Sequence, residues 1–166
     1  MLIPNVRKTW APVGETPLLR HHYQRHRIST ITALTVSPHR QRLGLWVQFH
    51  RTNITGVEVR DFLRYLLRPR RGPVVLLWDG GTIHRRVLVR DFLECPTRLH
   101  VYPFPAYDPE LHPAEFVWTH TQGRLSNGAP DDLPELHTQL RRSFARIKNS
   151  QRLLHSCFRA SDLSWP

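Results

Sequence analysis

Two short stretches of the chain alternate, in part, apolar with polar residues. Residues 28–36 and 43–49 are rich in Ile, Leu, Val and Thr, and the turn-forming pair Ser37-Pro38 lies between them. Alternation of this kind is typical of strands with one buried face. Because the connection is short, the two stretches are predicted to form an antiparallel hairpin.

A third stretch, residues 74–78, is apolar throughout and runs directly into Asp79. A short continuous apolar run predicts a strand that is buried on both faces. An acid at its end would lie at the carboxyl edge of the sheet, where open α/β sheets carry their sites. The alternative is a helix N-cap, because Gly80-Gly81 and a helical pattern follow. The run alone leaves both interpretations open.

Apolar residues at helical spacing predict most of the remaining elements. The predicted helices are one that follows Asn53 or Thr55 and ends near Arg68, one over residues 84–94, one over 114–125, one from a capping box at Asp132 to Lys148, and one over 153–158. With a short strand at 98–102, residues 74–102 make a βαβ unit with parallel strands. The proline-rich residues 103–113 are predicted to form a stiff loop without regular structure. The element order predicts one α/β domain, a mixed sheet with flanking helices.

The charge balance indicates what kind of partner the chain binds. The chain has 166 residues and a net charge of +11, from 24 Lys and Arg against 13 Asp and Glu, and only two of the 24 are lysine. A basic, arginine-rich domain favours a phosphate-rich partner, which we expect to be nucleic acid. The alternative is codon bias toward arginine in a GC-rich genome.

The arginines gather in clusters that are candidate DNA contacts. A basic patch covers residues 20–27, and the other candidates are Arg68, Arg70, Arg71, Arg85, Arg86, Arg141 and Arg142. For the patch at 20–27 and for the helix face that carries Arg141 and Arg142, an ordinary solvated surface is an equally good interpretation.

Several classes of protein are disfavoured. Cys95 and Cys157 match no metal or disulfide pattern and are predicted to be buried thiols in a reducing compartment. No apolar run approaches the ~18 residues of a membrane span, and the N-terminus has no signal-peptide layout. We therefore expect a soluble cytoplasmic protein, associated with the nucleoid, that has no membrane partner. The chain also has no Gly-x-Ser-x-Gly elbow and no phosphate loop.

Two acids are the candidate chemistry. Asp79 ends the apolar strand, and Glu115 lies in the first turn of a predicted helix after the proline-rich loop. In the βαβ interpretation this loop leaves the sheet edge that carries Asp79, so the two carboxylates can converge. Mg²⁺ prefers such oxygen ligands, and a pair of bound ions can stabilise in-line displacement at phosphorus.

The segments around both acids resemble a known family. Residues 77–84, Leu-Trp-Asp-Gly-Gly-Thr-Ile-His, resemble the second-aspartate motif of mariner-like DDE transposases, and residues 103–118 are similar to the third-acid motif of that family. Residues 9–17, with Trp10, Pro12 and Pro17, resemble a segment found just after its first aspartate. The resemblance covers essentially the whole chain and follows the bacterial insertion-sequence branch.

This resemblance implies a ribonuclease H-like mixed sheet and Mg²⁺-dependent DNA strand cleavage and strand transfer, with Mn²⁺ as a possible substitute. It assigns Asp79 and Glu115 as catalytic residues and metal ligands. His84 and His112 are expected to orient neighbours or line the site. Asp108 is expected to brace the loop, and the alternative for Asp108 is a third metal ligand. The implied partners are transposon ends and target DNA, and the active form is expected to be a homo-oligomer.

One departure from the family pattern decides how we interpret the whole chain. The first aspartate belongs on the central first strand and would lie upstream of Met1, as would the helix-turn-helix DNA-binding region. Residues 1–166 are therefore expected to be a partial catalytic domain with a truncated central strand, which leaves unpaired strand edges in mid-sheet. We expect the chain alone to be inactive unless an upstream transposase fragment supplies the strand. The alternative is a non-catalytic DNA-binding or regulatory fragment.

Overall fold

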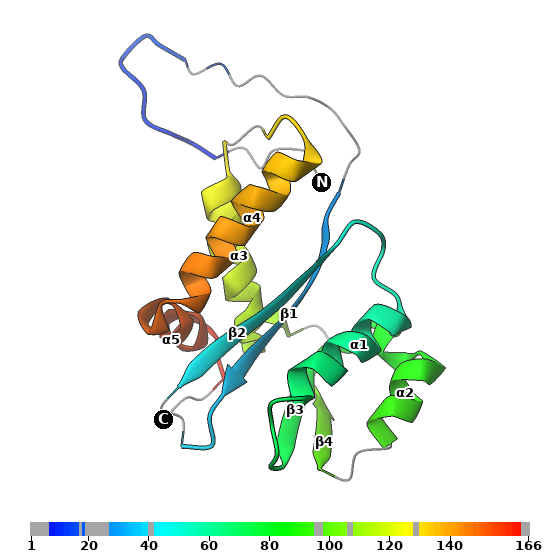
Figure 1. The fold of residues 1–166 in the computed structure, drawn as a ribbon. Coiled ribbons are helices and arrows are strands. Elements are labelled where there is room, and N and C mark those ends of the chain that lie inside the picture. Colours follow the sequence, from blue (N-terminus) through cyan, green and yellow to red (C-terminus); the bar gives the residue numbers. More distant parts are fainter. Residues whose placement is uncertain are drawn as a thin grey trace.

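The α/β architecture is observed in a computed structural model of the chain, which describes residues 7–16, 18, 27–39, 42–94, 98–105, 108–127 and 130–163, without the side chain of Arg85. In order, the elements are β1 (Ser29–Val36), β2 (Leu43–His50), α1 (Gly56–Leu67), β3 (Val74–Trp78), η1 (Thr82–Arg85), α2 (Val87–Glu94), β4 (Leu99–Pro103), η2 (Pro109–Leu111), α3 (Pro113–Leu125), α4 (Leu133–Lys148) and α5 (Gln151–Ala160) (Figure 1).

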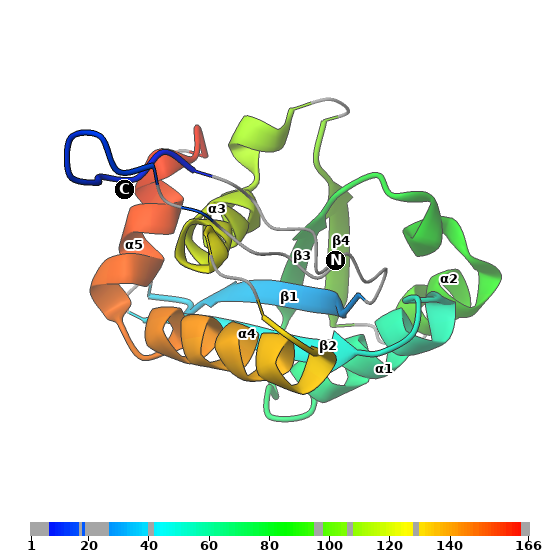
Figure 2. The ribbon, with the colours of Figure 1, turned by 90° about the horizontal axis from the view of Figure 1, so that it is seen from above.

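The predicted hairpin forms the middle layer of the fold. β1 and β2 pair antiparallel, from Ser29 opposite His50 to Val36 opposite Leu43. One face buries Leu43 and Leu45 against α4 and α5. On the other face Ile31 joins the cluster beneath α1. The hairpin accordingly lies between the α3–α5 group and the α1–α2 group in both views (Figure 1, Figure 2).

β3 and β4 form the predicted parallel pair, with Val74 opposite Leu99 and Trp78 opposite Pro103. Among the described residues this pair is a separate two-stranded sheet and is not hydrogen-bonded to the hairpin, so the single mixed sheet is present as two pieces. The predicted burial of both faces of β3 is wrong, because Val75 is 63% exposed and Leu77 is 43% exposed. Only the face with Leu76 and Trp78 packs against the α1–α2 cluster.

Local hydrogen bonds explain where α1 begins and ends. Thr55, not Asn53, is its N-cap: Thr55 Oγ1 accepts from the Val57 amide at 3.2 Å, and Glu58 Oε2 accepts from the Thr55 amide at 2.7 Å. This reciprocal capping box satisfies amides that the first helical turn leaves unpaired. At the other end Arg98 donates to the carbonyls of Leu67 and Arg70, which joins the start of β4 to the end of α1.

The largest core lies between the hairpin and the last three helices. It contains Val117 of α3, Phe144 and Ile147 of α4, and Leu154 and Cys157 of α5, all almost fully buried. The side-chain amide of Gln151 bonds the backbone of Leu43 in both directions, at 3.0 and 2.8 Å, and so ties α5 to β2. Burial raises the pKa of the Cys157 thiol to about 11, so this cysteine is a protonated, buried apolar group as predicted.

Three predicted elements differ in detail. The helix expected over residues 84–94 is split at Arg86, whose backbone is extended, into η1 and α2. The proline-rich loop contains the short 3₁₀ helix η2, because Pro109 lies at its first position, where the missing amide costs nothing. The last helix is longer than residues 153–158, because Ser150 caps it by accepting from the Leu153 amide.

Some predictions fall on residues that the structure does not describe. These are the strand tail at residues 1–4, the part of the basic patch at residues 20–26, and Cys95. Within the described ranges, no helix combines the length and apolar character needed to cross a bilayer.

Candidate active site

Asp79 follows β3 and is held by groups of the next five residues. Its Oδ1 accepts from the Gly81 amide at 3.0 Å and from Nε2 of His84 at 2.9 Å. Both donors bond to Oδ1. No donor among the described residues bonds to Oδ2. The Asp79 side chain is 62% exposed. The carboxylate is thus oriented by one oxygen and open to solvent at the other.

Glu115 lies in the first turn of α3, beside a second histidine. His112 precedes the helix, and its Nδ1 lies 3.9 Å from Glu115 Oε1. The Glu115 side chain is 53% exposed. Burial lowers the pKa of His112, and the charges of Glu115 and Asp79 oppose this shift. Asp79 and Glu115 thus both lie within electrostatic range of His112.

Each histidine is fixed by an aromatic ring as well as by its acid. The His84 ring stacks on Trp78 at 4.3 Å between centroids, and the His112 ring contacts Phe104 at 4.9 Å. Burial lowers the pKa of both imidazoles, against the opposing effect of the nearby carboxylates. A neutral His84 donates its Nε2 proton to Asp79, which leaves the buried Nδ1 without a partner among the described residues. Both rings thus lie beside the acids and add no positive charge there at neutral pH.

Comparison with known proteins identifies the family of the chain that carries these acids. Residues 2–137 match the protein family described as DDE superfamily endonuclease. The chain belongs to this family. The sequence resemblance to DDE enzymes is confirmed, and the family match spans Asp79 and Glu115.

Solved structures show the same fold. The chain superimposes on the Mos1 mariner paired end complex with Mn with a TM-score of 0.62 and 20% identity, over 95% of this chain and 49% of that one. The structure of the Mos1 transposase catalytic domain with Raltegravir and Mn gives a TM-score of 0.56 and 18% identity, over 80% of this chain and 78% of that one. The ribonuclease H-like fold class is therefore confirmed. The chain spans about half the length of the first chains it matches. A search of curated proteins finds no match.

Asp79 and Glu115 both carry solvent-exposed carboxylates. Oxygen donors of this kind suit a hard divalent cation. In the described part of the chain, no group of three His, Cys, Asp or Glu side chains is arranged to hold a metal ion. Asp108 precedes η2 and is half-buried, and its side chain does not cap that helix. Asp79 and Glu115 are thus two candidate oxygen donors without a third among the described residues.

The predicted DNA-contact arginines lie in different surroundings. Arg68, Arg71, Arg86, Arg141 and Arg142 are exposed, and the side chain of Arg85 is outside the described part of the structure. Arg70 is half-buried: its guanidinium lies 4.7 Å from the Trp46 ring and donates to the carbonyl of Leu66. This internal role was not visible in the sequence, because Trp46 is distant along the chain.

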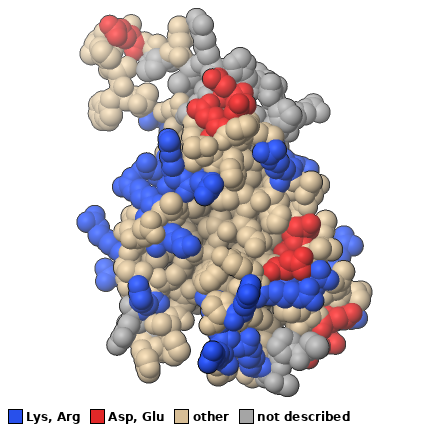
Figure 3. All heavy atoms as spheres, viewed as in Figure 1, with Lys and Arg blue, Asp and Glu red and all other residues tan. Residues whose placement is uncertain are grey.

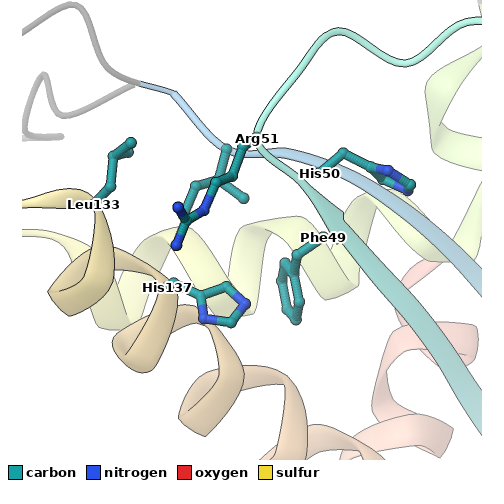
Figure 4. A pocket seen from close by; sticks show the side chains of 6 residues that line it. Phe49, His50, Arg51, Leu133 and His137 are labelled. Atoms are coloured by element: carbon teal, nitrogen blue, oxygen red, sulfur yellow. The ribbon is translucent and has the colours of Figure 1, made fainter.

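A small pocket lies apart from the two acids. Its lining is Ile28, Phe49, His50, Arg51, Leu133 and His137. Figure 4 shows the Arg51 guanidinium directed toward the His137 ring, while His50 points to the other side of the strand. None of the site residues predicted from the sequence lines this pocket. No sequence motif predicts this pocket, since its residues come from three separate segments.

The Asp79–His84 contact depends on Gly81. A Cβ atom there would lie 2.9 Å from Asp79 Oδ1 and 3.3 Å from the His84 ring, whereas a Cβ at Gly80 meets nothing within 4 Å. Gly81→Ala is expected to displace the pair, with a loss of about 1 kcal/mol in unfolding free energy, and to shift the NMR signals of the His84 ring. Gly80→Ala is the matched control and should leave them in place. Unchanged His84 signals in Gly81→Ala would show that the pair does not form.

Proposed function

We propose that this chain is the catalytic-domain portion of a DDE transposase, which cleaves and joins DNA strands with the help of Mg²⁺ or Mn²⁺. The single observation that carries the proposal is that a chain of the DDE family places Asp79 and Glu115 within electrostatic range of the same histidine, His112. The Mos1 structures with the same fold include complexes with Mn and with a transposon end, which supports metal and DNA as partners.

Asp79 and Glu115 would hold the metal through their exposed carboxylate oxygens. The bound cation would supply activation of the attacking oxygen and stabilisation of the charge that develops at phosphorus. The chain's own histidines position the acids: His84 holds Oδ1 of Asp79, and His112 lies beside Glu115. Asp108, whose backbone carbonyl accepts from the Leu111 amide at 3.3 Å, would brace the loop that precedes Glu115. The exposed arginines offset repulsion between the acids and DNA phosphates.

Two carboxylates form an incomplete set for this chemistry, so we propose that a further carboxylate joins them when the site is active. Its source would be additional sequence or an upstream transposase fragment, and the active assembly would be a homo-oligomer at DNA within the cytoplasm. The chain by itself would then be inactive. The second candidate function is a DNA-binding or regulatory fragment, which is favoured by the two-acid site together with the net charge of +11.

Nicking of supercoiled plasmid in Mg²⁺ or Mn²⁺ tests the catalytic proposal. The chain alone is expected to give no nicking, and a polypeptide in which a strand-forming segment with an aspartate precedes it is expected to nick. Asp79→Asn or Glu115→Gln should then lower the rate by at least about 100-fold, since each removes a metal ligand. Asp91→Asn, a change at an exposed acid of α2, is the control. Nicking that survives both site variants would contradict the proposal.

The basic face of α4 gives a separate prediction for DNA binding. Figure 3 shows Lys and Arg gathered over the side of the molecule where α4 and α5 lie. Replacing Arg141 and Arg142 with alanine is expected to weaken binding to duplex DNA and to lower the slope of log K against log salt by about 1–2, through lost phosphate contacts. Arg90→Ala is the control, because Arg90 is paired with Asp91 and Glu94. An unchanged salt slope would place the DNA on another face.

A further inference from the structure

The small pocket beside the end of β2 has no role in the chemistry proposed for Asp79 and Glu115. It has a volume of about 100 Å³ and is lined by the end of β2, the start of α4 and Ile28. This volume is about three times the share of one water molecule in the liquid. The pocket therefore has room for one polyatomic group and is smaller than the pockets that hold drug-sized ligands.

The pocket combines an apolar floor with two groups that can donate hydrogen bonds. Ile28, Phe49 and Leu133 supply carbon surface. The His137 ring meets the edge of the Phe49 ring at 5.2 Å between centroids, which fixes it beside this floor. The Arg51 guanidinium is directed toward the His137 ring (Figure 4). Guanidinium is always charged and only donates, so these groups suit an anionic acceptor.

The charge of Arg51 is not neutralised within the described part of the fold. Its guanidinium forms no hydrogen bond and no ion pair with any described residue. The acids at the start of α4 are instead bonded to backbone amides of that helix start. Asp132 Oδ1 accepts from the Glu135 amide at 2.7 Å, and Glu135 Oε2 accepts from the Asp131 amide at 2.8 Å. The fork of an unpaired arginine matches a phosphate group in shape and charge.

The pocket lies at the beginning of a basic stripe along α4. Arg141 follows His137 by four residues and Lys148 follows it by eleven, so all three share one side of the helix. Arg141 and Lys148 are exposed. Four residues of helix span about 6 Å, which is on the order of two nucleotide steps along one DNA strand. The stripe thus has a spacing that suits phosphates of the same strand.

We propose that this pocket holds one backbone phosphate of DNA. Arg51 pairs with the phosphate oxygens, His137 donates a ring N–H to them, and the adjoining sugar lies against Phe49 and Leu133. The strand then continues past Arg141. The apolar floor favours a phosphate that carries a sugar over a bare ion, since contacts to both parts are usual at DNA backbones. This site rests on the DNA partner of the proposed function and adds a contact that no sequence motif marks.

The test is binding of the 166-residue chain to a fluorescein-labelled duplex of about 20 base pairs, roughly two helical turns. Fluorescence anisotropy is measured at several salt concentrations in EDTA, so that the result is independent of any metal at the two acids. Arg51→Gln is expected to weaken binding by about tenfold and to lower the slope of log K against log salt by about 1, because one phosphate contact is lost. Arg90→Gln is the matched control, since Arg90 is exposed but paired with Asp91 and Glu94.

A second variant separates the hydrogen bond from the packing of the pocket. His137→Phe keeps a ring against Phe49 and removes the ring N–H, and it is expected to weaken duplex binding by about threefold or more. Thermal unfolding followed by circular dichroism should be unchanged in Arg51→Gln, because Arg51 is exposed and unpaired among the described residues. A loss of affinity in Arg51→Gln then reports the pocket and not a damaged fold.

Inorganic phosphate distinguishes DNA from a free ion as the occupant. The NMR signals of the His137 ring are expected to shift with the duplex at micromolar concentrations, and with inorganic phosphate only at millimolar concentrations. Saturation by micromolar inorganic phosphate, together with an unchanged duplex affinity in Arg51→Gln, would identify a free phosphate as the ligand and overturn the proposal.

The remaining outcomes separate this inference from the proposed function. Equal duplex affinity in Arg51→Gln and the parent chain would overturn the pocket assignment. If the alanine variant of Arg141 and Arg142 still weakened binding in that case, DNA would remain the partner and would follow a path outside the pocket. A parent chain that does not bind the duplex at all would contradict the DNA partner itself, and the pocket assignment with it.

Discussion

Replacing Phe144 with alanine is expected to lower the free energy of unfolding by about 3–5 kcal/mol. Phe144 is 3% exposed, and its ring meets the edges of the Phe49 and Trp118 rings at 5.6 and 5.4 Å. Phe144 of α4 therefore contacts two other elements, β2 and α3. Removing the ring takes away buried apolar surface from all of these elements and leaves a cavity that a strand and two helices cannot readily close.

The measurement is urea unfolding followed by circular dichroism. Phe144→Leu, which keeps most of the volume, should lose roughly half as much stability as Phe144→Ala. Leu88→Ala is the control at an exposed helical position, where a change within about 0.5 kcal/mol is expected. An unfolding midpoint in Phe144→Ala equal to that of the parent chain would mean that α4 does not pack on the hairpin as observed.

The order of elements follows from local patterns, because periodicity and caps act over a few residues. The hairpin, the β3–β4 pair and the starts of α1 and α4 are where alternation, apolar runs and the caps at Thr55 and Asp132 place them. The exposure of Val75 and Leu77 was not predictable in this way. An apolar run identifies a strand but carries no information on which elements cover its two faces.

The residues of the site also divide into those that local motifs predict and those that depend on long-range packing. Motif spacing predicts that Asp79 and Glu115 converge, because both follow the carboxyl ends of neighbouring parallel strands, and the structure places both acids within electrostatic range of His112. The aromatic supports were not predicted: Trp78 under His84 and Phe104 against His112 depend on side-chain packing. Arg70 was predicted to contact DNA because it belongs to a basic cluster in the sequence. In the structure its guanidinium packs on the Trp46 ring instead.

Replacing Asp79 with asparagine, or Glu115 with glutamine, is expected to weaken Mn²⁺ binding by about tenfold or more, because each change removes one of two anionic oxygen ligands. The parent chain is expected to bind Mn²⁺ weakly at this site, because the described residues offer no group of three side chains that could hold a metal ion. Mn²⁺ is paramagnetic, so it broadens the NMR signals of nearby protons. The ring signals of His84 and His112 report the site directly, since Nε2 of His84 lies 2.9 Å from Asp79 and Nδ1 of His112 lies 3.9 Å from Glu115.

Selective broadening of these two histidines separates a metal site from general attraction of cations to acids. Asp91→Asn is a close control, because the Asp91 side chain is 60% exposed and that of Asp79 is 62% exposed. If exposure and charge alone decided binding, the two substitutions would have equal effects. If convergence decides it, Asp79→Asn and Glu115→Gln abolish the broadening of both rings while Asp91→Asn leaves it unchanged. Equal loss in all of these variants would mean that the two acids do not act as one site, and the proposed catalytic role would lose its structural basis.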